Sequence, residues 1–191
     1  MRKQLKRGQF TLTEKQIKKL FTGALRHRDR VVLKLLALCG LRRDEVRNIK
    51  IQDIDFEKER LTVVGKFRVE RVVPVPGELI QDIKFLIGNT RPEWLFRSTR
   101  KHGEPISLKT INCIVADAGR VSKVSNPDRS RKNLNPHLLR HSFARLLKDK
   151  GMPLEVIQNL LGHKHFSTTM DQYGLLSIEE IHDRFRSVFE S

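Results

Sequence analysis

The spacing of hydrophobic residues predicts three helices in the first fifty positions. One helix is expected to begin after Thr13, which starts a capping box, and to run to about Ala24. Residues 29–39 are apolar on nearly every side, which is typical of a buried central helix, and Gly40 is placed to end it. A third, short helix is expected over 44–49.

The pattern changes after residue 50. Three short segments, 51–56, 60–64 and 69–75, are rich in Ile, Val and Thr and are separated by turn-like breaks, which predicts three strands. Helical periodicity then returns, with helices expected over 78–87, 107–120, 136–150, 153–161, 167–173 and 177–190. The chain is therefore predicted to be mainly α, with a small antiparallel three-stranded β-sheet.

Charge adds the first indication of a partner. The 191 residues include 38 Lys and Arg against 22 Asp and Glu, a net charge of +16. The excess lies in residues 1–43 and 91–145, with segments close to neutral between and after them. Blocks of positive charge indicate a basic face on a folded body, as a nucleic-acid-binding protein needs. A generally basic, solvated surface remains the alternative.

Composition excludes several classes of protein. The longest run without Lys, Arg, Asp or Glu has eight residues, too few to span a membrane, and no apolar signal core follows the basic N-terminus. We therefore expect a cytoplasmic protein. Cys39 and Cys113 lie far apart in apolar contexts and are expected to be buried free thiols. Neither a metal site nor a Walker motif is evident, so no cofactor is expected.

Two groups of residues could act on a phosphate. Tyr173 is the one tyrosine beside ten phenylalanines, which makes it a candidate nucleophile rather than packing, although a surface residue is the alternative. His137 and Arg140 lie three positions apart on one face of a predicted helix, where they could bind phosphate oxygens or form an ordinary polar stripe. His141 is expected to lie off that face.

Three further positions are candidates with simpler explanations. Arg42 follows the buried helix directly and needs a partner or a ligand there, and Glu45 could be that partner. Lys66 lies at the end of a predicted strand pair and could be an ordinary turn lysine. His163 ends the helix before Tyr173. No Cys, Asp or Glu lies at the distance along the chain from His163 that a zinc site would need.

Five segments together resemble the tyrosine recombinases, or phage integrases, including the Xer-type recombinases. They are GLRRDE at 40–45, VVGKFRVERVVPV at 63–75, HLLRHSFA at 137–144, LLGHKHFSTT at 160–169 and MDQYG around Tyr173. Each segment is weak evidence alone, but their order and spacing are those of the family. The resemblance covers about residues 11–176 and implies the catalytic domain of such an enzyme.

The resemblance implies a role for each matched position. Arg42 and Arg140 match the two arginines that hold the non-bridging oxygens of the scissile phosphate. His137 matches a histidine that assists proton transfer at the phosphate. Glu45 matches an acidic residue that braces the site without reacting.

The other matched positions are those of the nucleophile and its helpers. Tyr173 matches the nucleophile, Lys66 the general acid for the leaving 5′-oxygen, and His163 a histidine that hydrogen-bonds the phosphate. Nearby cations would lower the pKa of the phenol and stabilise the charge that develops at phosphorus. The expected intermediate is a covalent 3′-phosphotyrosyl link, which needs neither metal nor ATP.

The resemblance also implies an organisation and partners. Residues 1–10 are expected to form a basic arm, 11–176 the catalytic domain, and 177–191 a C-terminal helix that either exchanges between protomers or folds back on its own domain. The separate N-terminal core-binding domain of the family is expected to be absent. The implied partners are double-stranded DNA, further copies of the chain in a dimer or tetramer, and an accessory DNA-binding protein or core-binding domain.

Basic residues outside the catalytic set are expected to contact DNA. These are Arg2, Lys3, Lys6, Arg7, Arg43, Arg68, Arg129, Arg131 and Lys132. Two other functions remain open on the sequence. One is a type IB topoisomerase-like enzyme that relaxes supercoils, and the other is a DNA-binding remnant without catalysis.

Overall fold

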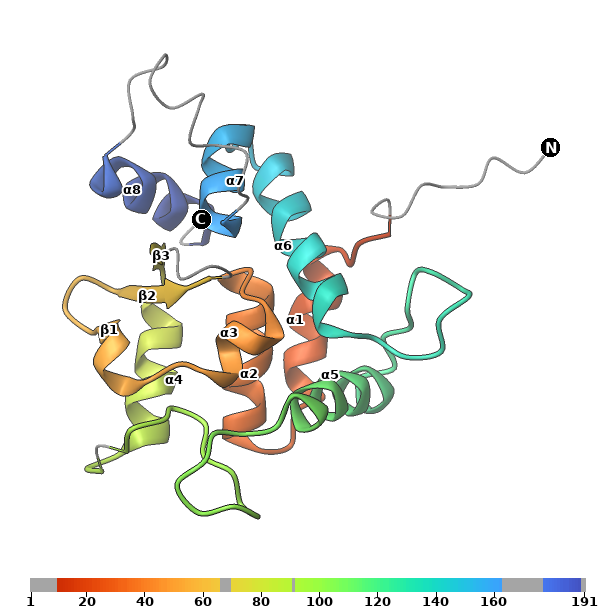
Figure 1. The fold of residues 1–191 in the computed structure, drawn as a ribbon. Helices are drawn as coiled ribbons and strands as arrows, with labels where there is room; N and C mark the ends of the chain where they lie inside the picture. Colours follow the sequence, from red (N-terminus) through yellow and green to blue (C-terminus); the bar gives the residue numbers. More distant parts are fainter. Residues whose placement is uncertain (1–9, 66–69, 91, 163–176, 190–191) are drawn as a thin grey trace.

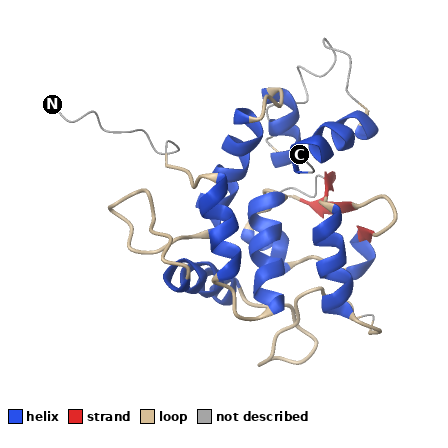
Figure 2. Ribbon diagram, turned by 180° about the vertical axis from the view of Figure 1, so that it is seen from behind, coloured by secondary structure: helices blue, strands red, loops and turns tan. Residues whose placement is uncertain are grey.

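The structure is a computed structural model that describes residues 10–65, 70–90, 92–162 and 177–189 (Figure 1). Most of the described chain is helical, and the strands form one small patch (Figure 2). The helices are α1 (Glu14–Thr22), α2 (His27–Leu38), α3 (Arg43–Arg47), α4 (Gly77–Ile87), α5 (Leu108–Val121), α6 (Pro136–Asp149), α7 (Leu154–Leu161) and α8 (Ile178–Phe189). The predicted fold class is confirmed.

One three-stranded antiparallel sheet lies beside the helices. It contains β1 (Ile54–Asp55), β2 (Arg60–Val64) and β3 (Glu70–Pro74), in that order. Residues 51–53, predicted as the start of the first strand, instead form a short 3-10 turn, η1. The Asp53 side chain accepts a hydrogen bond from the backbone N–H of Lys50, 3.0 Å away, and this local bond bends the chain out of the sheet.

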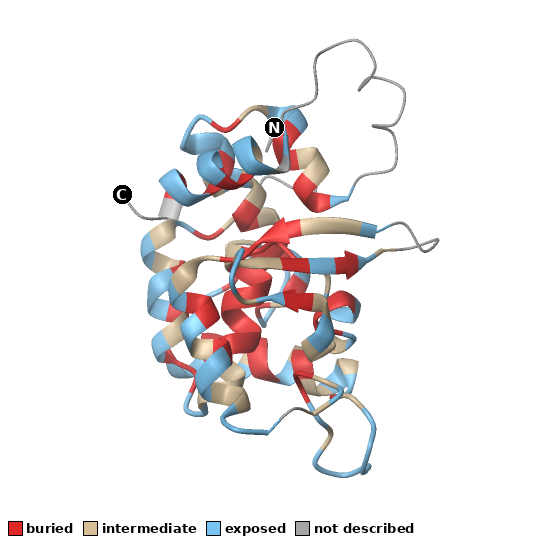
Figure 3. Ribbon diagram, turned by 90° about the vertical axis from the view of Figure 1, so that its left-hand side faces the viewer, coloured by how far each residue is buried: buried red, intermediate tan, exposed pale blue. Residues whose placement is uncertain are grey.

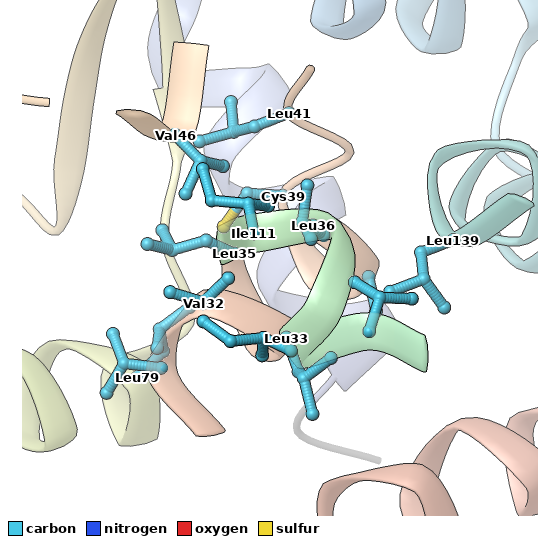
Figure 4. Close-up of a cluster of buried hydrophobic side chains, with 14 of the residues drawn as sticks. Val32, Leu33, Leu35, Leu36, Cys39, Leu41, Val46, Leu79, Ile111 and Leu139 are labelled. Atoms are coloured by element: carbon cyan, nitrogen blue, oxygen red, sulfur yellow. The ribbon is translucent and has the colours of Figure 1, made fainter. Parts of the chain in front are cut away.

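Helix α2 lies at the centre of the core. Seven consecutive residues of this helix, 31–37, are buried, as expected from its apolar sequence. It packs against α1, α4, α5 and α6, so side chains such as Leu79, Ile111 and Leu139 surround it (Figure 4). Buried positions gather on the inner sides of the surrounding elements (Figure 3). Burial on every side is what keeps this helix in place.

A second hydrophobic cluster joins α6, α7 and α8. Phe143 and Leu147 of α6 contact the inner side of α7 at Leu160, and Phe185 and Val188 of α8 complete the cluster. The rings of Phe143 and Phe185 lie with their centroids 6.4 Å apart. Helix α8 therefore folds back on its own chain in this structure.

The two cysteines differ in their surroundings. Cys39 is fully buried after α2, and burial raises the pKa of its thiol, as expected for an inert core cysteine. Cys113 is exposed on α5, so the prediction that it is buried was wrong. The buried face of α5 is formed by Ile111, Ile114 and Val115, which leaves position 113 on the outer side of the helix.

Candidate active site

The turn after α2 brings two distant parts of the chain together. Gly40 has a positive φ of 62°, and a Cβ atom at this position would lie 2.3 Å from a ring carbon of Phe143. Glycine is therefore required both by the backbone and by the close approach of α6. This approach sets Arg42, which follows the turn, beside Arg140 on α6.

Arg140 is held by backbone carbonyl groups. Its side chain is 8% exposed, and it donates hydrogen bonds to the carbonyl oxygens of Gly40, at 2.6 Å, and of Leu161. Burial lowers the pKa of this guanidinium to about 10, and the positive charge of Arg42 acts in the same direction. Arg140 therefore remains a cation at neutral pH.

Glu45 binds two arginines with one carboxylate. It accepts hydrogen bonds from the backbone N–H and the Nη1 of Arg42, at 2.7 and 2.9 Å, so the pairing expected between these residues is present. Two further bonds come from Arg71, each 2.8 Å long. Burial alone would raise the pKa of this carboxyl, but the hydrogen bonds and charge of Arg71, together with the bonds from Arg42, lower the pKa to about 2.

His137 lies on α6 one turn before His141, and the two rings touch. Their Nε2 atoms are 2.7 Å apart, so one nitrogen donates and the other accepts. The expectation that His141 lies off this face was wrong, because residues four apart on a helix are neighbours. Burial, and then the charges of the partner ring and of Arg140, lower the pKa of His137, and burial and Arg140 lower that of His141.

Arg42, His137 and Arg140 lie around a hollow of about 560 Å³. Arg42, Arg43, Arg131, His137 and Arg140 supply its cationic and imidazole lining. Since the carboxylate of Glu45 is already saturated by hydrogen bonds, the hollow is suited to an anion that accepts from several donors. A phosphate group has this chemistry.

The basic residues expected to contact DNA divide into groups. Arg43 and Arg131 are exposed and line the hollow, and Lys132 is exposed beside them in sequence. Arg129 is also exposed, but it lines a different hollow with residues of α1 and Lys123. Residues Arg2, Lys3, Lys6, Arg7 and Arg68 lie outside the described residues.

Three candidate catalytic residues also lie outside the described part of the chain. They are Lys66, His163 and Tyr173. The described chain stops at Gly65, directly before Lys66, and at Gly162, directly before His163. Their roles therefore stay predictions.

Arg71 is the site residue that sequence reasoning missed. It pairs across the sheet with Val63, which is buried, and its side chain is 8% exposed. Positions 71, 73 and 75 share one face of the strand, and Val73 and Val75 are buried. An arginine on the same face as two buried valines was the signal in the sequence that Arg71 faces the interior. The alternation of inward and outward positions is not visible in the sequence, because Val72 and Pro74 on the other face are apolar as well.

Comparison with known proteins identifies the family. Residues 11–178 match the sequence profile of the phage integrase family. The chain belongs to this family. The tyrosine recombinase XerA of Pyrococcus furiosus is 39% identical over 165 residues, which cover 83% of this chain and 55% of XerA. The tyrosine recombinase XerC of Staphylococcus aureus is 36% identical over 171 residues, covering 84% and 55% of the two chains.

Solved structures of integrase-family proteins have the same fold. The crystal structure of XerA recombinase matches with a TM-score of 0.71 and 26% identity, over 93% of this chain and 64% of that one. The integrase from mycobacterium phage Brujita matches with a TM-score of 0.77 and 18% identity, over 93% and 57%, a likeness of fold. The chain spans about half the length of the curated relatives that it matches.

The described residues offer neither a metal site nor a membrane-spanning helix. No group of three or more His, Cys, Asp or Glu side chains in this part of the integrase-family chain could hold a metal ion. None of the described helices is long and apolar enough to cross a membrane.

Proposed function

We propose that this chain is the catalytic domain of a site-specific DNA recombinase that cleaves and rejoins DNA through a covalent 3′-phosphotyrosyl intermediate. The observation that carries the proposal is the placement of Arg42, Arg140 and His137 around one open hollow, beside a carboxylate that is already saturated. The names of the relatives, tyrosine recombinases XerA and XerC, support the same reaction.

Arg42 and Arg140 bind the non-bridging oxygens of the scissile phosphate in this proposal. Arg42 is 36% exposed and reaches into the hollow, while Arg140 is fixed by two carbonyl groups. Guanidinium groups held in place before the substrate arrives stabilise the charge of a pentacoordinate phosphorus without reorganisation. His137, whose lowered pKa keeps it neutral at pH 7, can accept a proton at the phosphate.

The covalent step uses residues outside the described part of the chain. The phenol of Tyr173 gives its proton to His137 as its oxygen attacks phosphorus, the bond to the 5′-oxygen breaks, and Lys66 gives that oxygen a proton. His163 donates a hydrogen bond to the phosphate. The phosphodiester energy is kept in the 3′-phosphotyrosyl bond, so a 5′-hydroxyl can reverse the step and rejoin a strand.

Double-stranded DNA and further copies of the chain are the proposed partners. Structural relatives include a XerH recombinase bound to its difH substrate and a lambda integrase dimer bound to a core site. We propose that this chain likewise binds DNA as a dimer or tetramer, in the cytoplasm, with a core-binding domain or accessory protein completing the grip. The exposed Arg43 and Arg131 extend the cationic hollow and support DNA as the ligand.

Exchange of residues 177–191 between protomers is part of this proposal. Helix α8 contacts its own chain through the apolar Phe185 and Val188 and through ion pairs of Glu179 with Arg60 and of Arg186 with Glu59. A neighbouring copy carries the same partner groups and could offer them equally. Deleting 177–191 is expected to abolish assembly of protomers on DNA and to spare DNA binding. Light scattering of the DNA complexes tests this, and assembly that survives the deletion would contradict it.

Covalent trapping tests the catalytic proposal. The protein is incubated with nicked duplexes of randomised sequence, and DNA that stays attached in SDS is recovered and sequenced. We expect an adduct that is lost in Tyr173→Phe, with a preferred sequence at the junction. Relaxation of supercoiled plasmid without a sequence preference would instead indicate a topoisomerase. DNA binding without any adduct, even with a core-binding domain supplied separately, would indicate a non-catalytic protein.

A further inference from the structure

Arg71 contributes no surface to the hollow, yet it contacts Glu45, which binds Arg42 of the hollow, and the C-terminal end of α7. The residues that line the hollow in the described chain do not include Arg71. Its Nη1 and Nη2 atoms both donate to Glu45, and its Nε donates to the carbonyl oxygen of Leu160 at 2.8 Å. Each of the three guanidinium nitrogens thereby donates a hydrogen bond within the protein, so a bound phosphate is not expected to displace it.

Arginine side chains bind the C-terminal end of α7. Three successive carbonyl oxygens at this end each accept a hydrogen bond from a different arginine. The pairs are Leu160 with Arg71, Leu161 with Arg140, and Gly162 with Arg42. The last carbonyl groups of a helix have no partner within the helix and carry partial negative charge, so guanidinium groups satisfy them well.

The arginines differ in how firmly they are held. Arg42 reaches Gly162 across 3.4 Å and is partly exposed, so this contact is readily exchanged for a phosphate oxygen. Arg71 makes three bonds of 2.8 Å and is 8% exposed. Gly162 has a positive φ of 66°, and a Cβ at this position would lie 3.1 Å from the Arg71 side chain, which shows how closely the helix end is seated on it.

Arg71 also determines how many hydrogen bonds Glu45 accepts from Arg42. Each carboxylate oxygen accepts one bond from Arg71 and one from Arg42. Without Arg71, two acceptor positions of a buried carboxylate would be vacant. The cations beside them are Arg42, already bonded to Oε1 at 2.9 Å, and Arg140, whose Nη1 lies 3.8 Å from Oε2. Either guanidinium would then turn toward Glu45 and away from the hollow.

We propose that Arg71 is a positioning residue of the strand-cleavage site. By binding Glu45 and the end of α7 together, it keeps Arg42 directed at the phosphate and fixes the point from which the chain continues to His163. This inference rests on the proposed function, because the effect it predicts is on DNA cleavage. Since Arg71 does not line the hollow in the described chain, it acts through Glu45 and the end of α7.

Single-turnover cleavage of a trapped substrate measures this role. Arg71→Lys keeps the charge but cannot span two carboxylate oxygens and a carbonyl. We expect it to slow adduct formation on the order of 100-fold, as displaced catalytic groups do, with DNA affinity unchanged. Arg71→Ala should be slower still and should be partly restored by millimolar guanidinium ion, which can occupy the vacated site. Guanidinium that restored thermal stability without restoring rate would overturn the proposal.

A matched variant separates positioning from loss of stability. Lys34 is another buried cation, which bridges Glu78 at 2.5 Å and Asp82 at 2.6 Å away from the hollow. Lys34→Met should lower the melting temperature and leave the cleavage rate intact below it. If Arg71→Lys cleaves as fast as the wild type, or if Lys34→Met slows cleavage as much, Arg71 has no positioning role.

A second readout needs no cleavage. The ¹⁵Nε–¹Hε resonance of Arg42, assigned by its loss in Arg42→Lys, should shift in Arg71→Lys and stay in place in Lys34→Met. An unmoved resonance would overturn the proposal even if the wild type formed no adduct. Conversely, a wild type that forms no Tyr173-linked adduct while this resonance shifts would contradict the proposed function alone.

Discussion

The guanidinium group of Arg140 donates a 2.6 Å hydrogen bond to the carbonyl oxygen of Gly40, which lies 100 residues earlier in the chain. The bond exists because the glycine turn lets Phe143, one helical turn after Arg140, approach the backbone at Gly40. The same contact therefore serves both the hydrophobic core and the cationic hollow. Stability and site geometry are coupled at this point.

Gly40→Ala should destabilise the protein by roughly 3 kcal/mol, because it adds a Cβ clash to a strained backbone. Gly151→Ala is the matched control, since Gly151 also has a positive φ, 81°, but has nothing within 4 Å of the added Cβ. Urea denaturation of both variants measures the difference. Equal losses would show that the contact with Phe143 does not matter.

The carboxyl of Glu45 should make the fold sensitive to acid. Its pKa in the folded protein is lowered from 4.5 to about 2, so its stabilising contribution is complete above pH 4.5 and is lost as the pH falls toward 2. About 2 kcal/mol of this contribution should disappear between pH 6 and pH 3. The free energy of unfolding should therefore differ more between the two pH values in the wild type than in Glu45→Gln. A variant with the same pH dependence as the wild type would contradict this assignment.

Removing His141 should raise the pKa of His137. Burial is the main cause of the lowered value and persists in His141→Gln, while the contribution of the neighbouring ring is lost. NMR titration of the His137 ring measures the change, with the exposed His102→Gln as control. A pKa of His137 that stays at the wild-type value in His141→Gln would show that the ring contact has no electrostatic effect.

Both histidines should also destabilise the fold in mild acid. Their pKa values in the folded chain lie below the usual 6.5, so the unfolded chain takes up protons first as the pH falls. Stability should therefore decline below about pH 6.5 and less so in His141→Gln. Thermal melts between pH 7.5 and pH 5.5 measure this decline. An identical decline in the variant would exclude a contribution from His141.

DNA affinity should depend on salt through the exposed arginines of the hollow. Arg131→Ala should weaken binding at all sequences and reduce the slope of log affinity against log salt by about 1. Lys101→Ala is the control, because Lys101 is also exposed and paired with an acid three residues away. It belongs to the segment between α4 and α5, which lies at the end of the molecule away from α7 (Figure 1). Fluorescence anisotropy over a salt series measures both slopes, and equal slopes would exclude Arg131 from the interface.

Phe185→Ala should remove a central part of the second hydrophobic cluster. Its side chain is 2% exposed, and such truncations cost roughly 3 to 5 kcal/mol. Phe85→Ala should cost much less, because Phe85 is 76% exposed. Chemical denaturation at two protein concentrations measures the loss in free energy of unfolding in each variant. A loss that appears only at high concentration would show that α8 packs on a second copy instead of its own chain.

Elements with strong local signals were predicted well from sequence. The capping box at Thr13 and the second and third strands are present within one or two residues of their predicted positions. The first strand was predicted too long because the hydrogen bond from the Lys50 backbone to the Asp53 side chain competes with strand pairing. Local hydrogen-bonding choices of this kind leave little trace in hydrophobic spacing.

The sequence by itself determined the family, the helical periodicity and the candidate catalytic positions, because these depend on residues close together in the chain or on motifs of fixed spacing. Only the tertiary structure decided which arginines share Glu45 and which of them bind the end of α7. Arg71 and Arg42 carry the same side chain, so composition cannot distinguish them. Their difference arises from which donors face a buried carboxylate and the end of α7, and that depends on packing between segments 26 to 120 residues apart.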